Sequence, residues 1–198
     1  MLPGLCICAL IPRLVTRTQL VVLVHYREAR KPTNTGGLAA RCLVDSRVAI
    51  IGERDRPVTV EVPQRALLLY PSDDAVPIAS AIADAPAERW TLVVPDGNWR
   101  QAAKMAKRVP GLAAARHVTL DDPRASEYRL RAEPKQGGLA TLEAIARALR
   151  VLEGDAGERA EAAMLELFRV MVSRTLWSRG ALRDDELVGG VPTGASRG

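Results

Sequence analysis

The positions of apolar and polar residues along the chain predict short buried strands separated by helices. Four runs are rich in Val, Leu and Ile and lack alternating polar residues: 19–26, 47–51, 66–70 and 91–95. Such runs are typical of strands that are covered on both faces, as in a parallel sheet between helices. Two weaker runs, 57–62 and 117–120, predict strands at the edges of the sheet.

Five other segments have apolar residues at helical spacing. They are residues 35–44, 75–85, 98–109, 139–153 and 158–179. In the fourth segment, Leu142, Leu149 and Leu152 share one helical face, and Gly154 follows as a candidate C-cap. The alternation of strands and helices predicts an α/β fold, with a mainly parallel sheet and helices on both of its faces.

The length of the chain, 198 residues, suits one sizeable core rather than two domains. We expect a single domain over residues 1–182 and a disordered tail over 183–198, because the tail is polar and rich in Gly. The formal net charge of +5 slightly favours an anionic partner, nucleic acid before membrane, although a solvated basic surface explains it equally well.

The three cysteines, Cys6, Cys8 and Cys42, are too few for a disulfide framework, which favours a reducing compartment. The first residues, MLPGLCICALIPRL, contain an apolar patch without a basic region before it, and Pro12-Arg13 interrupts the patch early. This start resembles neither a signal peptide nor a membrane span, and no other apolar run has the length of a span. We therefore expect a cytoplasmic protein without a membrane partner.

Polar residues gather at the ends of the predicted strands. In the segment 24–37, His25 and Glu28 follow a strand, while Asn34 and Thr35 open a helix. A lone histidine in such a place is more often structural than catalytic, and Asn34 or Thr35 serves well as a simple helix cap. After the strand at 66–70, Ser72 or Asp73 could likewise cap the next helix.

The segment PDGNWRQAAKMAKRVPG, residues 95–111, places Asp96 directly between a strand and a helix. Open α/β sheets bind ligands at such junctions, although Asp96 is also a good candidate for an ordinary N-cap. Four cations on one face of the helix form the basic stripe: Arg100, Lys104, Lys107 and Arg108. This stripe is suited to a polyanion, or it is a solvated surface.

The segment YRLRAEPKQGGLATLEA, residues 128–144, carries paired glycines before a helix. Glycines allow a ligand to approach the backbone closely, and the N-terminus of a helix favours a carboxylate or a phosphate. The spacing matches neither the GxxxxGK[ST] pattern of NTPases nor the GxGxxG pattern of dinucleotide enzymes. The sequence therefore supports neither of these classes.

Taken in order, HYREARKPTNTGGLA, LLYPS, DGNWRQAAKM and YRLRAEP…GGLATLEAIA resemble the motifs of the DTW-domain family. The resemblance spans roughly residues 5–180 of the chain. Characterised bacterial members are tRNA-uridine aminocarboxypropyltransferases, and the family is related to the SPOUT class. The resemblance therefore implies a SPOUT-like fold with a C-terminal trefoil knot, S-adenosylmethionine as the group donor, and tRNA as the partner; it implies no protein partner.

Two departures from the family pattern bear on function. Asn98 stands where the name motif has Thr, and it keeps the ability to form hydrogen bonds and to cap a helix. Family members commonly carry a Cys pair upstream of a C-x-C motif, a set suited to tetrahedral zinc. Here Cys6-Ile7-Cys8 stands alone near Met1, and we expect no metal.

The family reaction moves the 3-amino-3-carboxypropyl group of S-adenosylmethionine to N3 of a uridine and releases 5′-methylthioadenosine. The leaving thioether is neutral, so the enzyme needs a group that removes the N3 proton or orients it, and we assign this role to Asp96. Trp99 is assigned to stack on the uracil or to face the sulfonium, and an anchor in the core is an equally good role for it.

The resemblance also implies where the two substrates bind. The donor is expected to lie against Tyr70, Ser72, Pro95, Gly97, Gly138, Leu139 and Thr141, with Arg131 as a partner for its carboxylate. The uridine site is assigned to His25, Glu28, Asn34 and Thr35. The basic stripe is assigned to tRNA phosphates, contacts that position RNA without reading its sequence.

Two other classes of function remain open from the sequence. A SPOUT-type RNA methyltransferase would use the same donor and transfer its methyl carbon instead. A non-catalytic RNA-binding module would need only the basic stripe, and the pairing of Asp96 with Trp99 argues against that reading.

Overall fold

The computed structural model describes residues 3–53, 63, 65–112, 115–130 and 138–196. Within these residues, six strands form one sheet in the order β2-β1-β5-β3-β6-β4, and every described pairing is parallel. The strands are β1 (Gln19–His25), β2 (Ser46–Ile51), β3 (Ala66–Leu69), β4 (Val76–Pro77), β5 (Thr91–Asp96) and β6 (Arg116–Thr119). The predicted parallel sheet is therefore confirmed, while the predicted strand at 57–62 lies outside the described residues.

In the described part of the chain, five helices overlap the predicted segments, and a further short helix, at residues 26–29, was not predicted. The helices are α1 (Tyr26–Ala29), α2 (Thr35–Cys42), α3 (Ile78–Ala81), α4 (Trp99–Arg108), α5 (Thr141–Glu153) and α6 (Asp155–Ser178). The prediction of one helix over 75–85 is wrong, because Val76–Pro77 pairs with β6 as β4 and leaves only four residues for α3. Among the described helices, none has the length and apolar character needed to cross a membrane.

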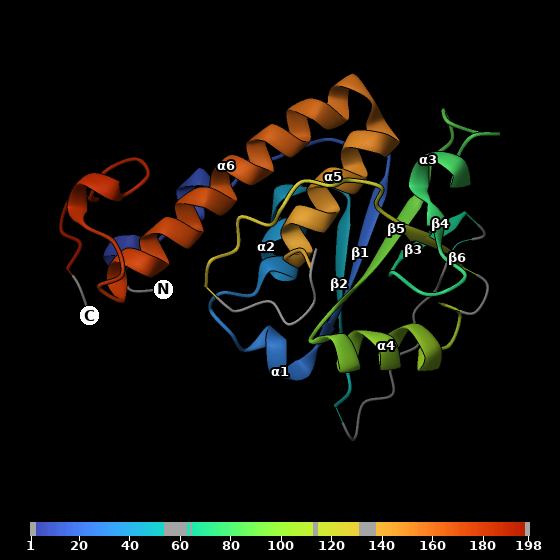
Figure 1. Ribbon diagram of the computed structural model, residues 1–198, viewed down its shortest axis with the longest axis horizontal. Helices are drawn as coiled ribbons and strands as arrows, with labels where there is room; N and C mark the ends of the chain where they lie inside the picture. Colours follow the sequence, from blue (N-terminus) through green and yellow to red (C-terminus); the bar gives the residue numbers. More distant parts are fainter. Residues whose placement is uncertain (1–2, 54–62, 64, 113–114, 131–137, 197–198) are drawn as a thin grey trace.

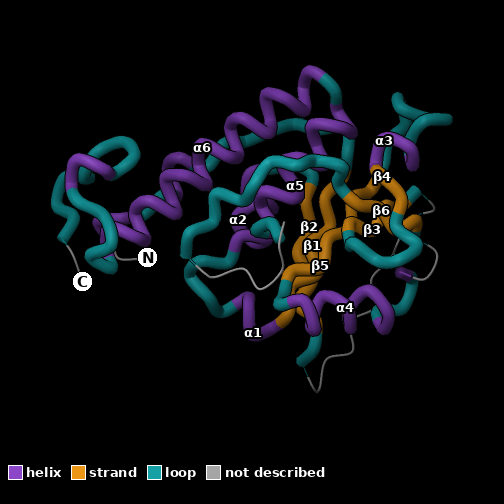
Figure 2. The backbone as a smooth tube through the Cα atoms, viewed as in Figure 1, coloured by secondary structure: helices purple, strands orange, loops and turns teal. Residues whose placement is uncertain are grey.

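Alternate residues of β1 point to two different cores. Leu20, Val22 and Val24 pack into the larger core, which contains buried residues of α2, α5 and α6. Val21 and Leu23 face the smaller core with Met105, Ala106 and Val109 at α4. Helices therefore cover both faces of the sheet, as predicted: Figures 1 and 2 show α4 on one side and α2, α5 and α6 on the other.

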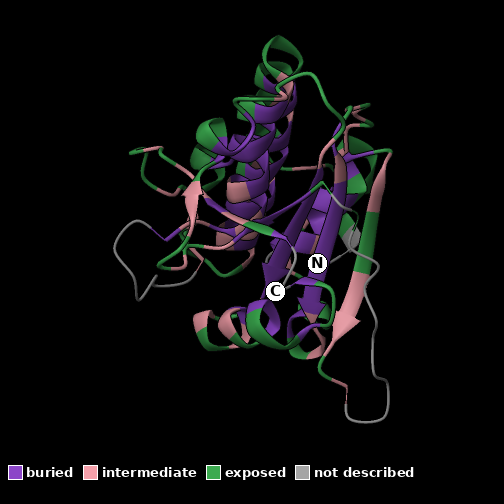
Figure 3. Cartoon of the chain, turned by 90° about the vertical axis from the view of Figure 1, so that its right-hand side faces the viewer, coloured by how far each residue is buried: buried purple, intermediate pink, exposed green. Residues whose placement is uncertain are grey.

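Strand β2 forms one edge of the sheet, and this differs from the sequence-based expectation. Its apolar run predicted burial on both faces, but Arg47 and Val48 are exposed. Figure 3 shows this strand with exposed and intermediate residues beside the buried central strands. The apolar pattern is wrong for this strand because the order of strands, which places β2 last beside β1, decides its burial.

The segment that we expected to be a disordered tail makes specific contacts with α6. Leu187 is buried beside Leu5 and Trp177. The indole of Trp177 donates a hydrogen bond to Asp184 (2.7 Å), and the amide of Val188 donates one to the Ser173 hydroxyl (2.9 Å). The two ends of the described chain therefore meet at the end of α6 (Figure 1). The trefoil knot that the resemblance implies stays a prediction.

Candidate functional site

Asp96 lies at the carboxyl end of β5, beside Val24 of β1, and only 6% of its surface is exposed. Its Oδ1 accepts a hydrogen bond from the Thr141 hydroxyl (2.5 Å), and its Oδ2 accepts one from the Asn34 amide nitrogen. Thr141 is the first residue of α5, and Asn34 is the N-cap of α2. Asp96 therefore connects the central strand to the amino-terminal ends of two helices.

Asn98, not Asp96, caps α4, so the interpretation of Asp96 as an ordinary N-cap is wrong. The Asn98 side chain accepts a hydrogen bond from the backbone amide of Gln101 (2.9 Å), and the Gln101 side chain accepts one from the Asn98 amide (2.8 Å). The capping role expected for Asn98 in place of Thr is thus confirmed. Because the cap is supplied two residues later, the Asp96 carboxylate can bond to α2 and α5 instead.

Gly36 brings the first turn of α2 against the Asp96 side chain. A Cβ at position 36 would lie 2.7 Å from Asp96 Cγ and 2.7 Å from its Oδ2, closer than a side-chain carbon is found. The same turn is closed by Asn34, whose Oδ1 accepts a hydrogen bond from the Gly37 amide (2.6 Å). The sequence NTGG therefore both caps α2 and leaves room for the carboxylate.

These contacts surround a small cavity of about 80 Å³, which we call the small cavity. It is lined by Glu28, Thr33, Asn34, Thr35, Asp96, Gly97, Tyr128, Leu139, Ala140 and Thr141. Seven of these residues were assigned from the sequence: Glu28, Asn34, Thr35, Asp96, Gly97, Leu139 and Thr141. Three segments that lie far apart in the sequence thus meet at one point, at the carboxyl edge of the sheet.

The LLYPS segment lies elsewhere in the structure. The Ser72 hydroxyl is 2.7 Å from Nδ1 of His117, and Asp74 is 3.2 Å from the same nitrogen. Tyr70 packs against the core on the α4 side. The N-cap of α3 is Pro77 and no side chain caps it, so the expectation that Ser72 or Asp73 caps the next helix is wrong.

The remaining assigned residues have separate positions. Pro95 is buried within β5 opposite Leu23, and Gly138 is buried just before α5. Trp99 is half-buried as the first residue of α4, and among the described residues it is not part of the lining of the small cavity. Arg131 lies outside the described residues.

Tyr128 is a lining residue that the sequence analysis did not single out. Its ring stacks on Phe168 of α6, with ring centroids 5.7 Å apart. The loop before it is held by Glu143, a fully buried residue of α5 that accepts hydrogen bonds from the Ser126 hydroxyl (2.6 Å) and the Glu127 amide (2.7 Å). Because Glu143 also accepts a bond from the Ala140 amide (2.8 Å), it joins this loop to the start of α5.

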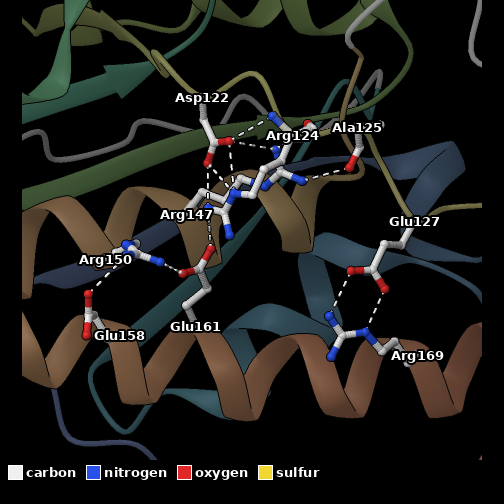
Figure 4. Close-up of polar contacts among 9 residues, drawn as sticks. All are labelled: Asp122, Arg124, Ala125, Glu127, Arg147, Arg150, Glu158, Glu161 and Arg169. Carbon is white, nitrogen blue, oxygen red and sulfur yellow. Dashed lines mark hydrogen bonds and ion pairs between the residues drawn. The ribbon is translucent and has the colours of Figure 1, made fainter.

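An ionic network fixes the preceding part of the loop to α5 and α6 (Figure 4). Arg124 pairs with Asp122 (2.5 Å) and with the buried Glu161 (2.7 Å), and its guanidinium holds the pKa of Asp122 at about 2. Arg147, only 4% exposed, donates hydrogen bonds to the carbonyls of Arg124 (2.7 Å) and Ala125 (3.0 Å). The wall of the small cavity that contains Tyr128 is therefore rigidly attached.

A second cavity, of about 720 Å³, lies along α4 and is called the large cavity. Its lining is His25, Tyr26, Arg27, Ile51, Gly52, Glu53, Asn98, Arg100, Gln101, Lys104, Met105, Arg108, Val109 and Pro110. Three residues of the basic stripe thus line it, and Lys107, which is exposed on the same helix, does not. Burial, with a contribution from the Arg27 charge, lowers the pKa of His25 below its ordinary value.

The two cavities lie on either side of the turn from β5 to α4. Gly97 lines the small cavity, while His25 lines the large cavity. Gly97 and His25 are neighbours, since a Cβ at Gly97 would lie 3.5 Å from the Cβ of His25, and Asn98, the next residue, lines the large cavity. The structure therefore divides the assigned uridine site: Glu28, Asn34 and Thr35 face one cavity, and His25 faces the other.

The cysteines are spread over different environments. Cys6 and Cys8 are exposed, and a hydrogen bond from Arg41 lowers the pKa of the Cys8 thiol. Cys42 is buried in α2, which raises the pKa of its thiol to about 11. Within the described part of the chain, no three His, Cys, Asp or Glu residues are grouped as metal ligands would be. That the protein binds no metal stays a prediction.

Comparison with known proteins adds independent information. The family described as DTW domain matches residues 1–176 of this chain. The tRNA-uridine aminocarboxypropyltransferase 2 of Drosophila melanogaster is 36% identical over 145 residues, which cover 69% of this chain and 57% of that protein. The protein of the same name from Macaca fascicularis is 32% identical over 157 residues, 75% of this chain and 53% of that protein. This chain thus spans about half the length of these two relatives.

A plant protein and one solved structure are also similar. The tRNA-uridine aminocarboxypropyltransferase A of Arabidopsis thaliana is 28% identical over 203 aligned positions, covering 85% of this chain and 76% of that protein. The structure of the SAM-dependent rRNA:acp-transferase Tsr3 from Vulcanisaeta distributa superposes with a TM-score of 0.47 and 17% identity, over 91% of this chain and 85% of that one.

Proposed function

The chain belongs to the DTW domain family, and we propose that it is a tRNA-uridine aminocarboxypropyltransferase. It transfers the 3-amino-3-carboxypropyl group of S-adenosylmethionine to N3 of a uridine in tRNA, in the cytoplasm, and releases 5′-methylthioadenosine. Family membership supplies the reaction. The observation that carries the proposal in this chain is the meeting of three distant motifs around the buried Asp96 carboxylate.

The residues around the small cavity fit the amino-acid end of the donor. Glu28 is a carboxylate, which suits an ammonium group, and the amino-terminal ends of α2 and α5 suit a carboxylate. A cavity of about 80 Å³ is smaller than the 300–1,000 Å³ or so of ordinary small-molecule sites. It therefore accepts one end of S-adenosylmethionine rather than the whole molecule.

The other donor contacts keep the assignment that the family motifs imply, although Tyr70 and Ser72 are not among the described lining residues of the small cavity. Tyr70 and Ser72 follow β3, which is the neighbour of β5 in the sheet, and Pro95 and Gly138 lie in the chain next to lining residues. Leu139 and Thr141 contribute directly to the wall. Arg131 lies outside the described residues, so its assignment to the donor carboxylate rests on the family motif alone.

Asp96 acts on the proton of the uridine imide. When bound, S-adenosylmethionine supplies an electrophilic carbon beside its sulfonium and a leaving group that is neutral after transfer, so no acid is needed. N3 must lose its proton as the new N–C bond forms, and a positioned carboxylate is a suitable acceptor. Thr141 and Asn34 hold the Asp96 side chain in one orientation, which is the arrangement that proton transfer requires. Trp99 is assigned to the uracil or the sulfonium, as the family motif implies.

The experiment that tests this proposal uses unmodified tRNA and S-adenosylmethionine that is labelled separately in its methyl carbon and in its aminocarboxypropyl carbons. We expect the aminocarboxypropyl label in tRNA, together with an equal amount of 5′-methylthioadenosine. Recovery of S-adenosylhomocysteine with methyl-labelled tRNA would identify a methyltransferase instead. Binding of tRNA without transfer of either label would identify a non-catalytic RNA-binding module.

A further inference from the structure

The large cavity combines a cationic wall with an apolar floor. Arg100, Lys104 and Arg108 follow one another at four-residue intervals along α4, about 6 Å apart along the helix axis. Beneath them lie Met105 and Val109, which are 3% and 8% exposed. A row of cations attracts a chain of phosphates better than it fits a single small anion, because the charge is spread along a line.

An aromatic side chain, Tyr26, is also part of the lining of the large cavity. Tyr26 is half-buried at the start of α1, and the ring of His25 lies 4.7 Å from its ring. The Arg27 guanidinium carbon is 5.6 Å from the centre of the Tyr26 ring, and its Nε donates a hydrogen bond to the Tyr26 hydroxyl (2.9 Å). The tyrosine ring is thus held in place by its neighbours, which lowers the entropy cost of stacking a base on it.

The charge balance of the cavity favours an anionic ligand. Among its described lining residues there are four cations, Arg27, Arg100, Lys104 and Arg108, and one carboxylate, Glu53. Its volume of about 720 Å³ is within the range of sites that enclose a whole small molecule. These features match the parts of a nucleotide in a strand. The aromatic ring suits the face of a base, the row of cations suits the phosphates on each side, and the apolar floor suits the edge of the sugar.

We propose that the large cavity binds one unstacked nucleotide of single-stranded RNA, with its base on Tyr26 and its flanking phosphates on Arg100, Lys104 and Arg108. A base stacked within a double helix cannot enter such a cavity, so the ligand is a single strand. The proposal deepens the proposed function, because the cavity borders the Asp96–Asn98 turn and the nucleotide held there is a neighbour of the modified uridine. Binding itself requires neither the donor nor the transfer reaction.

The test measures the affinity of the full chain for a short unmodified oligouridylate and for a duplex of equal length, over a range of salt concentrations and without S-adenosylmethionine. We expect the single strand to bind more tightly. Tyr26→Ala should weaken its binding about 5- to 150-fold, the usual range for loss of one base–aromatic stack, whereas Tyr26→Phe should retain it.

The cations provide a second, independent variant with a matched control. Changing Arg100, Lys104 and Arg108 together to Gln should lower the slope of log affinity against log salt by about 2, since each phosphate contact contributes about 0.7 for a single strand. Arg159→Gln removes one exposed charge from α6, away from the large cavity, and should leave the slope unchanged. A thermal unfolding curve for each variant checks that it is folded.

Equal affinity for single strand and duplex, wild-type affinity of Tyr26→Ala, or equal slopes for the triple variant and Arg159→Gln would each overturn the proposal. These results are distinguishable from failure of the proposed function. A protein that binds the oligonucleotide as described but transfers no label from S-adenosylmethionine retains this site and loses that activity. If the wild-type protein transfers the label but gives one of the three binding results above, this site is ruled out and the proposed function stands.

Discussion

The small and large cavities are neighbours across one turn, yet they are constructed in opposite ways. The small cavity takes lining residues from segments more than 100 positions apart, and both Asp96 oxygens are already fixed by hydrogen bonds. The large cavity takes most of its lining from α4 and from the ends of β1 and β2, and its charges lie on long side chains. Chemistry requires atoms fixed to a fraction of an ångström, while attraction of a polyanion requires only charge in the right region.

The largest effect is expected for Asp96→Asn. This substitution should remove the transfer reaction at the small cavity without weakening RNA binding at the large cavity. The amide cannot accept the imide proton, so the single-turnover rate of transfer with saturating tRNA should fall about 10²- to 10⁴-fold, or roughly 3 to 5 kcal/mol in activation free energy. Binding of tRNA should be unchanged, because Asp96 lines the small cavity and is not among the described lining residues of the large cavity. Higher pH should restore part of the activity, since hydroxide can then remove the proton.

The fold should tolerate this substitution. Asn34 Nδ2 can only donate, so the oxygen of the introduced amide would face it. The nitrogen of the introduced amide would face Thr141, whose hydroxyl can turn to accept. A variant with a near-wild-type single-turnover rate would reduce Asp96 to a structural link between α2 and α5. The chemistry would then have to be assigned to other residues, with His25 and Glu28 the first to examine.

A smaller but still large effect is expected for Gly36→Ala, which changes only the position of the carboxylate. The added Cβ would lie 2.7 Å from Asp96 Cγ, so the side chain must move and its bond from Asn34 is strained or lost. A misplacement of about 1 Å can cost about 10²-fold in rate, and overpacking costs about 1–3 kcal/mol in the free energy of unfolding. Single-turnover kinetics and chemical denaturation measure the two effects. Unchanged transfer would show that the precise position of Asp96 is unimportant.

The smallest effect concerns the loop that contains Tyr128. The backbone amides of Glu127 and Ala140 donate to different oxygens of Glu143, so Glu143→Gln places an amide nitrogen against one of these donors and should lower the free energy of unfolding by about 1–3 kcal/mol. As a matched control, Arg169→Gln removes the half-exposed ion pair with Glu127 on the same loop, which is worth at most about 1 kcal/mol. Denaturant titration measures the free energy of unfolding of both variants. Equal losses would mean that the buried position of Glu143 adds nothing to the stability of the loop.

The sequence was sufficient for features that depend on local pattern. The strands at β1, β3 and β5 and the helices α4, α5 and α6 lie close to their predicted ranges, because each apolar run or stripe is itself the surface that becomes buried. The same logic failed for β2, whose apolar residues are partly exposed at an edge. Burial there depends on strand order, which no short window of sequence contains.

The candidate site was predictable in part for the same reason. Asp96, Asn34 and Thr141 follow strands or open helices, and the carboxyl ends of parallel strands meet at one edge of a sheet. Tyr128 was missed because its place depends on Glu143 and the Arg124 network, contacts between segments without a shared pattern. The stripe on α4 was visible in the sequence. That Arg108 lines a cavity and Lys107 does not follows only from the packing of α4 beside β1 and β2.

Because the Tyr128 loop is attached to α5 and α6, the residues of the large cavity are synthesised before those of the small cavity are complete. Every lining residue of the large cavity lies within positions 25–110. The small cavity also needs Tyr128 and residues 139–141, and its loop is held by Glu161 and Arg169 of the last long helix. A growing chain, which is made from its amino terminus, therefore contains every residue of the cationic cavity while the transfer centre is still incomplete. A chain interrupted between these points contains the lining residues of the large cavity but lacks the residues of α5 and α6 that cover the other face of the sheet.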